Sequence, residues 1–462
     1  MPVPHALERE RDLIVIGGGP GGMAAARAAA RAGVRPLLVQ VGPIGGDCTF
    51  TGCVPSKTLI EAAARGASFD EAMGTVHRVV ATIASGEDDE VFRREGVDVL
   101  HGWATFRSPH EIEVDGTVLR SGRFVIATGT QPSLPPVDGL ADIELLTNEN
   151  VFELADRPAS LAVLGGGAVG CELAQAFRRL GADVTVIEAL DRLLAREEPE
   201  ASAAVAEQFA ADSIQLRIGR RVWRVEQLEA KGAVRLHLDD SDTVCADRLL
   251  VAVGRRGSTG GLGLEAAGVA TEAGFVRVDD RLATTAPGIW AVGDVTGMLQ
   301  FTHAADEMGR VAVANALSGR GRRRFDPSAI PWVTFTSPEV ARVGMTEAEA
   351  AGHGGRVAFL TMEAVDRAVT AGRTRGFVKL LAGPRRLLGN AGGGRILGAT
   401  IVAERGGEMI HEAALAMHTG MFAGRLAQTV HAYPTWSMAI RQAAAQFFME
   451  IDGSRARPAR HP

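Results

Sequence analysis

The sequence predicts an α/β fold built on two Rossmann-like units, each a strand, a glycine-rich turn, a helix and a second strand. One unit covers residues 13–39 and the other covers residues 161–188. The same order of apolar runs and glycines in both indicates an internal repeat. At 462 residues the chain is too long for one hydrophobic core and suits two to four domains.

The first unit starts with the apolar run 13–16, which leads into a turn containing Gly17, Gly19 and Gly22. An alanine-rich helix follows, and then the apolar strand 37–39. Glycines at this spacing permit a tight turn, the approach of a pyrophosphate and the packing of helix on strand, while the helix N-terminus offers free N–H groups. The first unit therefore predicts a dinucleotide site.

The second unit repeats this arrangement. The apolar run 161–164 leads into Gly165, Gly167 and Gly170, then into a helix and the strand 184–188. Plain glycine-rich turns are the alternative reading of such a motif. A strand before and a helix after both motifs favour two bound dinucleotides.

The residue that ends the second strand of each unit distinguishes the two dinucleotides. Glu188 follows Gly170 by 18 residues, where a carboxylate accepts hydrogen bonds from the ribose hydroxyls and repels a 2′-phosphate. We therefore expect NADH to be preferred over NADPH, with the nearby Arg192 acting against this preference. Gln40 takes the equivalent position in the first unit and accepts from a ribose without bringing charge.

Two cysteines with four residues between them stand at the start of a predicted helix. On an ideal helix Cys48 and Cys53 diverge by about 140°, whereas a disulfide needs Cβ atoms ~3.8 Å apart. The first turn must be distorted, and Gly52 and Pro55 are suited to that. A helix N-terminus stabilises a thiolate. The motif predicts a redox-active disulfide; two buried free cysteines are the alternative.

Charge and hydropathy argue against several classes of partner. The formal net charge is −6, and basic residues cluster only at 320–324 and near the C-terminus, so we expect no nucleic-acid binding. No apolar run reaches the ~20 residues that span a bilayer, and the N-terminus lacks the apolar core of a signal peptide. Cys171 and Cys245 stand alone, unlike a secreted disulfide framework. We expect a cytoplasmic protein with no membrane contact and no resident metal.

Further motifs follow in order along the chain, at residues 127–129, 252–256, 291–294 and 335–339. Together with the two glycine turns and the cysteine pair, they resemble the flavoprotein disulfide reductases, the family of glutathione reductase, dihydrolipoamide dehydrogenase and mercuric reductase. The resemblance covers about residues 11 to 450. It implies an enzyme that uses FAD and NAD(P)H.

The resemblance also implies roles for individual residues. Asp294 binds the ribityl hydroxyls of FAD. Cys53 lies against the flavin and Cys48 attacks the substrate, while Lys57 reaches the flavin and pairs with Glu172, since a buried ammonium needs a counter-charge. Further cofactor contacts are expected at Gly46, Ala104, Thr128, Gly129, Gly254 and Ala304.

The C-terminal motif points to the acceptor. In the disulfide-reducing branches a histidine and a glutamate act as acid and base here, whereas this chain has Tyr433 and Met438. A phenol, with a reference pKa of ~10, is a poor base at neutral pH. Tyrosine at this position resembles the mercuric reductases. However, the C-terminal vicinal cysteines of those enzymes are absent. His431 is a possible substitute acid–base group, although it should point to the opposite side from Tyr433.

We therefore expect electrons to pass from NAD(P)H through flavin and the Cys48/Cys53 disulfide to a soft metal ion, Hg(II) or Cu(II). A low-molecular-weight or lipoamide-type disulfide is the alternative acceptor, and a pathway-specific thiol/disulfide oxidoreductase is a further one. A purely structural FAD-binding protein needs neither the cysteine pair nor Lys57, so these residues argue against it.

Domain boundaries follow from these assignments. We expect a split FAD domain, an inserted NAD(P) domain, a C-terminal α+β dimerisation domain and a flexible tail. By resemblance the protein is a homodimer in which the Tyr433 segment completes the active site of the other subunit. The expected domains cover 1–145 with 265–325, 146–264, 326–450 and 451–462.

Overall fold

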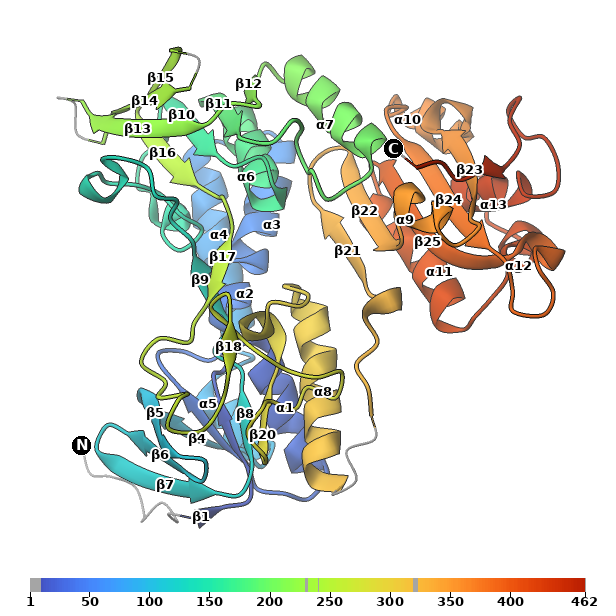
Figure 1. Ribbon diagram of the computed structural model, residues 1–462. Coiled ribbons are helices and arrows are strands. Elements are labelled where there is room, and N and C mark those ends of the chain that lie inside the picture. Colours follow the sequence, from blue (N-terminus) through green and yellow to red (C-terminus); the bar gives the residue numbers. More distant parts are fainter. Residues whose placement is uncertain (1–9, 229–231, 240, 319–322, 462) are drawn as a thin grey trace.

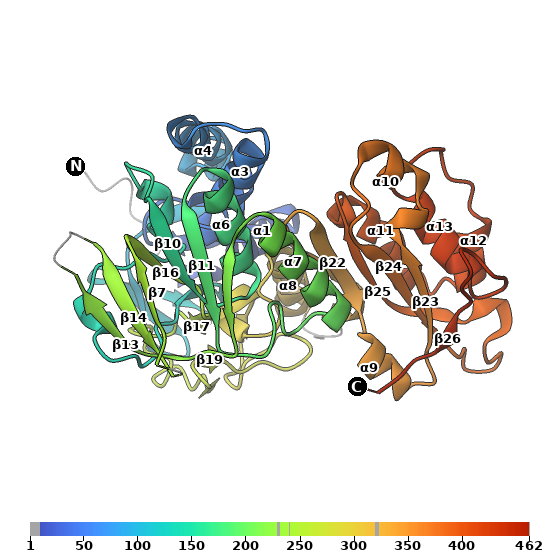
Figure 2. The same ribbon diagram turned by 90° about the horizontal axis from the view of Figure 1, so that it is seen from above.

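The computed structural model describes residues 10–228, 232–239, 241–318 and 323–461 (Figure 1). Most of the predicted basic run, 320–322, lies outside these ranges. Two parallel sheets with their helices form one part of the molecule, and a third, antiparallel sheet lies beside them (Figures 1 and 2). The predicted mixed α/β class is confirmed.

The first parallel sheet has the strand order β20-β8-β2-β3-β4. Its strands are β2 (Ile14–Ile16), β3 (Leu37–Gln40), β4 (Asp98–His101), β8 (Phe124–Ile126) and β20 (Ile289–Ala291). Helices α1 (Pro20–Arg31) and α8 (Thr302–Ser318) pack together closely, because a Cβ at Gly309 would lie 2.5 Å from the carbonyl oxygen of Gly21. Strand β20 comes from far along the chain and joins this sheet by pairing with β8 in parallel.

A small sheet of order β1-β7-β6-β5 extends this region. Its strands are β1 (Glu10–Arg11), β5 (Ala104–Ser108), β6 (Glu111–Val114) and β7 (Thr117–Ser121). Two short pairs lie nearby: β9 (Thr130–Pro132) with β17 (Arg255–Gly257), and β18 (Thr271–Glu272) with β19 (Phe275–Val276).

The second parallel sheet has the order β12-β11-β10-β16 and carries a three-stranded antiparallel sheet. The strands are β10 (Ser160–Leu164), β11 (Asp183–Glu188), β12 (Gln215–Ile218), β13 (Val222–Gln227), β14 (Val234–Leu238), β15 (Thr243–Ala246) and β16 (Arg248–Val251). Its helices are α6 (Ala168–Arg179) and α7 (Pro199–Ala211).

A group of helices follows the cysteine motif: α2 (Gly46–Phe50), α3 (Cys53–Ala64), α4 (Phe69–Ala84) and α5 (Asp89–Arg94). Helix α3 packs on α4 and on α6, so it bridges the two Rossmann-like units (Figure 1). The contact is apolar, and the rings of Phe69 and Phe177 lie 6.2 Å apart. Burial of such side chains holds the cysteine-bearing helix against the second unit.

The C-terminal sheet has the order β21-β22-β25-β24-β23-β26. Its strands are β21 (Pro331–Thr334), β22 (Glu339–Gly344), β23 (Arg356–Thr361), β24 (Phe377–Gly383), β25 (Arg395–Ala403) and β26 (Arg457–Pro458). Its helices are α9 (Glu347–Ala351), α10 (Asp366–Ala371), α11 (Gly406–His418), α12 (Ala423–Gln428) and α13 (Met438–Ala445). This is the predicted α+β architecture.

The chain end corrects one prediction. Residues 451–461 are not a flexible tail, because β26 pairs with β23 at the edge of the C-terminal sheet. The guanidinium of Arg457 forms an ion pair with Glu347, and the amide of Ala459 donates to the carbonyl of Gly355 at 2.9 Å. Arginine content suggested a solvated tail, but a carboxylate on α9 binds one of these arginines.

A buried lysine joins the second unit to the C-terminal sheet. Lys379, on β24, is 1% exposed. Its Nζ lies 2.8 Å from Glu200, 3.1 Å from Glu347 and 3.2 Å from Glu198. Glu198 and Glu200 lie at the start of α7, which sits beside this sheet in Figure 2. The cluster fixes α7 against the C-terminal domain.

Within the described residues, no helix is both long enough and apolar enough to cross a membrane.

Candidate redox site

The segment between the two cysteines is a single helical turn followed by a break. Helix α2 ends at Phe50, and α3 begins at Cys53. A Cβ on Gly52 would lie 2.8 Å from the carbonyl oxygen of Asp47, so the chain can fold back here only with glycine. This break is the distortion that the cysteine spacing requires.

Both cysteines are free thiols that contact one threonine. The Thr302 hydroxyl donates to the sulfur of Cys48 at 3.2 Å and lies 3.5 Å from the sulfur of Cys53. A hydrogen bond from Cys48 lowers the pKa of Cys53 to about 5, against the effect of burial, and Thr302 and Lys57 act in the same direction. The pKa of Cys48 is raised, first by its hydrogen bond to Cys53 and then by burial. These contacts favour the thiolate form at Cys53 over that at Cys48.

Sequence reasoning missed Thr302. It lies at the start of α8, 254 residues from Cys48, and belongs to no motif with a chemical signature. Its approach to the cysteines depends on how α8 and α1 pack across the first sheet. Only the fold brings this hydroxyl to the two sulfurs.

Lys57 and Glu172 form the ion pair that the sequence predicts. Lys57 Nζ lies 2.8 Å from Glu172 Oε2, and the ammonium is 4.7 Å from the centre of the Phe335 ring. The second oxygen of Glu172 accepts from the amide of Phe335 at 2.9 Å. Glu172 is buried, so both oxygens have the partners that a buried carboxylate needs.

The first glycine turn has the shape of a dinucleotide cradle. Gly17 has φ +107°, and a Cβ there would lie 2.3 Å from the carbonyl oxygen of Ala127. A Cβ on Gly22 would lie 1.8 Å from the carbonyl oxygen of Gly17, and one on Gly46 2.8 Å from the Cα of Gly19. Gly19 itself has no atom within 4 Å of such a position. Backbone atoms thus crowd the turn at Gly17, Gly22 and Gly46, whereas the space beside Gly19 is free, and this arrangement fits a pyrophosphate.

Several other predicted cofactor contacts line the same region. Burial raises the pKa of Asp294 to about 6, and its carboxylate accepts from the Thr130 hydroxyl at 3.4 Å. Gln40 accepts from the amide of Gly18 at 2.6 Å. A desolvated carboxylate with one long hydrogen bond fits a ligand rich in hydroxyl groups. The remaining predicted contacts stay predictions, and they lie on β5 (Ala104), after β8 (Thr128 and Gly129), before β17 (Gly254) and in α8 (Ala304).

The second glycine turn is built in the same way. A Cβ on Gly165 would lie 2.5 Å from the carbonyl oxygen of Ala252, and a Cβ on Gly170 would lie 2.0 Å from the carbonyl oxygen of Gly165. A Cβ on Gly167 would have no atom within 4 Å. Glu188 accepts from the amides of Gly166 at 2.6 Å and Leu190 at 2.8 Å. These bonds hold the carboxylate beside the turn.

Tyr433 and His431 lie apart from the cysteines of their own chain. Tyr433 is 70% exposed, and its hydroxyl donates to Asp366 at 2.9 Å, which raises the pKa of the phenol. The His431 ring nitrogens lie 3.0 Å from the carbonyl oxygen of Thr429 and 2.8 Å from Glu412. Both ring nitrogens thus have partners in their own chain, and a catalytic role for His431 stays a prediction.

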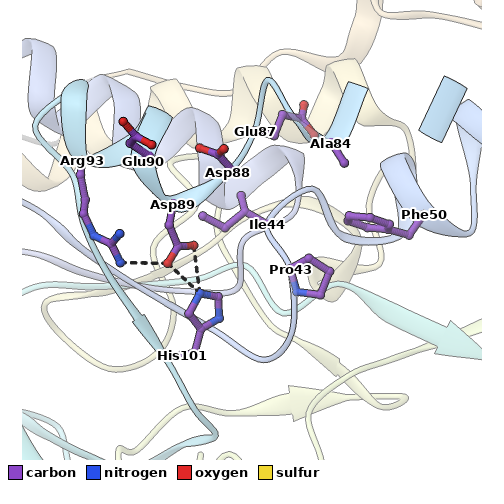
Figure 3. A pocket seen from close by; sticks show the side chains of 10 residues that line it. All are labelled: Pro43, Ile44, Phe50, Ala84, Glu87, Asp88, Asp89, Glu90, Arg93 and His101. Carbon is purple, nitrogen blue, oxygen red and sulfur yellow. Dashed lines mark hydrogen bonds and ion pairs between the residues drawn. The ribbon is translucent and has the colours of Figure 1, made fainter. Parts of the chain in front are cut away.

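A separate pocket of about 440 Å³ lies between the segment before α2 and the α4–α5 turn (Figure 3). Asp89 in its wall contacts both His101 and Arg93 (Figure 3). Neither the cysteines nor the glycine turns line it. No group of three or more potential metal ligands occurs among the described histidines, cysteines and acidic residues.

The sequence matches the family of pyridine nucleotide-disulphide oxidoreductases over residues 11–309 and the dimerisation domain of that family over residues 330–444. A mercuric reductase of Streptomyces lividans is 39% identical, covering 95% of this chain and 97% of the relative. A dihydrolipoyl dehydrogenase of Thermus scotoductus is 35% identical, covering 94% and 96%.

The solved structures agree with the sequence relatives. The Cu(II) complex of the HOCl-induced flavoprotein disulfide reductase RclA from Escherichia coli superposes with a TM-score of 0.87 at 30% identity, covering 94% of this chain and 99% of RclA. The match to the dimerisation domain indicates a homodimer. The chain belongs to the pyridine nucleotide-disulphide oxidoreductases, the FAD-dependent flavoprotein disulfide reductases that use a pyridine nucleotide.

Proposed function

We propose that this enzyme uses NADH to reduce a soft metal ion, Hg(II) or Cu(II), and that the Cys48/Cys53 pair delivers the electrons. The carrying observation is a pair of free thiols that both contact the Thr302 hydroxyl near the Lys57 ammonium, in a chain whose Tyr433 replaces the histidine base of the disulfide-reducing branches. Disulfide reduction leaves a thiolate that needs a proton, whereas a metal ion needs only thiolates and electrons.

The residues present fit the two nucleotides. Gly17, Gly19, Gly22 and Asp294 would hold FAD, which when bound would supply the conversion of one hydride from the nicotinamide into two electrons for the disulfide. Glu188 would accept from the ribose hydroxyls of NADH and repel the 2′-phosphate of NADPH.

Side chains of the protein would bind the metal ion and stabilise the thiolates. Glu172 holds the Lys57 ammonium beside Cys53, where the positive charge stabilises the thiolate. The Thr302 hydroxyl holds both sulfurs. Cys48 binds the metal ion as a thiolate, and its proton is released to solvent on binding. When the disulfide re-forms, two electrons leave the pair and reduce one Hg(II) to Hg(0) or two Cu(II) to Cu(I). Tyr433 of the other subunit would line this site.

The mercuric reductase relative at 39% identity and the Cu(II) complex of RclA support a metal acceptor. The second candidate is a lipoamide-type disulfide, which the dihydrolipoyl dehydrogenase relative at 35% identity favours. Against it stands Tyr433, since Asp366 raises the pKa of a phenol that is already protonated at neutral pH and therefore cannot take up a proton.

The test is anaerobic NADH oxidation with Hg(II), Cu(II), oxidised lipoamide or glutathione disulfide as acceptor. We expect one NADH consumed per Hg(II), or per two Cu(II) when a chelator traps Cu(I). Cys48→Ser should lower kcat/KM with metals by roughly 100-fold or more. Cys245→Ser, at an exposed cysteine, is the matched control. Full metal turnover by C48S, or a higher kcat/KM with lipoamide than with either metal, would contradict the proposal.

A further inference from the structure

Arg255 lies on β17, directly after the second parallel sheet, and reaches into the redox site. Its guanidinium donates to the hydroxyl of Thr130 at 2.6 Å and to the carbonyl of Thr130 at 3.0 Å. It also donates to the side-chain oxygen of Asn148 at 3.1 Å and forms an ion pair with Asp47. All of these contacts come from one side chain that is 21% exposed.

Two of these partners lead to the ends of the segment between the cysteines. Asp47 is the residue before Cys48. Asn148, held by Arg255 through its oxygen, donates with its nitrogen to the carbonyl of Thr51 at 3.3 Å. Arg255 thus holds residue 47 directly and residue 51 through Asn148.

The segment needs such support because it has little structure of its own. Helix α2 has five residues, and the amide of Thr51, the residue that caps its C-terminus, donates to the carbonyl of Asp47. An isolated turn of this length is unstable in water. The chain breaks at Gly52, where backbone freedom is greatest. External contacts must therefore set the distance between the two sulfurs.

A third partner connects Arg255 to the cofactor side of the site. The Thr130 hydroxyl that accepts from Arg255 donates in turn to Asp294 at 3.4 Å. Arg255 therefore pairs directly with the carboxylate of Asp47, and the Thr130 hydroxyl links it to the carboxylate of Asp294. A planar guanidinium, with several donors in fixed directions, suits this position better than a lysine.

We propose that Arg255 is a positioning residue that clamps both ends of residues 47–51 and so keeps Cys48 and Cys53 within bonding distance. The inference rests on the cysteine pair being the redox centre, as proposed above. Without the clamp the sulfurs meet less often, the effective concentration of one thiol at the other falls, and the disulfide becomes easier to reduce.

The test measures the thiol–disulfide equilibrium in the FAD-loaded, full-length protein. Samples are equilibrated under nitrogen with stepped ratios of reduced and oxidised dithiothreitol, alkylated with iodoacetamide, and the Cys48 and Cys53 peptides are quantified by mass spectrometry. In Arg255→Gln we expect the midpoint ratio to shift about tenfold toward the dithiol. Arg255→Lys should shift it similarly, because a lysine keeps the charge but not the fork of donors.

Asn148→Ala tests the link from Arg255 to Thr51. It breaks the link to Thr51 and leaves the Arg255–Asp47 pair in place, so we expect a shift of about threefold in the same direction. The double variant should be no worse than R255Q alone, because both changes act through one chain of bonds. Arg256→Gln, on the same strand, is the control, since its contact is Gln131 at 3.5 Å.

A midpoint in R255Q within twofold of the wild type would overturn the inference, as would R255Q and N148A effects that multiply. If R255Q loses FAD, R255K and N148A carry the same test. A wild-type protein that forms no Cys48–Cys53 disulfide at any ratio would instead contradict the proposed function, so the two failures are distinguishable.

Discussion

Lys57 Nζ lies 2.8 Å from Glu172 Oε2, and this ion pair joins α3 to α6 across 115 residues of sequence. Glu172 is 5% exposed at its side chain, whereas Lys57 is 32% exposed, so the carboxylate is the more desolvated partner. The pair therefore belongs both to the junction of the two Rossmann-like units and to the redox site. Four predictions follow from this and related contacts.

Lys57→Met should slow the reduction of the site by NADH by roughly 10- to 100-fold, because the Cys53 thiolate loses its cation and Glu172 loses its counter-charge. Glu172→Gln should cost less, since the amide oxygen still accepts from the amide of Phe335. Anaerobic stopped-flow measurement of the two variants and their double mutant checks this. Additive effects in the double mutant would show that the two residues act independently.

Glu188→Gln should weaken discrimination between the nucleotides. The amide copies Gln40 of the first unit and removes the charge that repels a 2′-phosphate. We expect the ratio of kcat/KM for NADH to that for NADPH to fall by roughly tenfold. Steady-state kinetics with both nucleotides measure the ratio. Gln40→Glu is the matched reverse change and should leave this ratio unchanged.

Lys379→Met should destabilise the protein by about 3–5 kcal/mol, because it leaves the buried carboxylate of Glu198 without its cation. Glu198 and Glu347 lose their shared partner, and α7 loses its attachment to the C-terminal sheet. The urea midpoint of unfolding measures the change. Lys57→Met is a useful comparison, since its lysine is more exposed and should cost less stability. Equal losses in the two variants would contradict the burial argument.

Glu339 should make stability decrease between pH 5 and pH 8. Burial raises the pKa of this carboxyl to about 7, although the amide of Gly407 donates to it at 2.7 Å. The folded state thus favours the protonated form. Its stabilising contribution is complete below the unfolded pKa of ~4.3 and is lost as pH rises through about 7.

Glu339→Gln tests this dependence, because glutamine does not titrate and still accepts from Gly407. We expect the wild type to lose roughly 2 kcal/mol more than the variant between pH 5 and pH 8. Urea unfolding of both proteins across this range measures the difference. Parallel pH profiles for the two proteins would show that Glu339 does not carry the effect.

Features that depend on local chemistry could be predicted from the residues alone. Gly17, Gly22 and Gly170 are required where a Cβ would collide with backbone, so their spacing predicts both turns. Cys48 and Cys53 cannot pair on a regular helix, so the break before α3 also follows from spacing.

Contacts between distant groups could not be predicted in this way, because they depend on how the helices and sheets pack. Thr302 and Arg255 approach the cysteines from more than 200 residues away, carried by α8 and β17, and local sequence signals do not encode such contacts. The same holds for His431, whose ring nitrogens lie beside Glu412 and the carbonyl oxygen of Thr429. The chain end was misjudged for this reason too, because Arg457 is ordered by its ion pair with Glu347. Packing across the molecule sets these distances, since contacts between distant segments form only when the sheets and helices assemble.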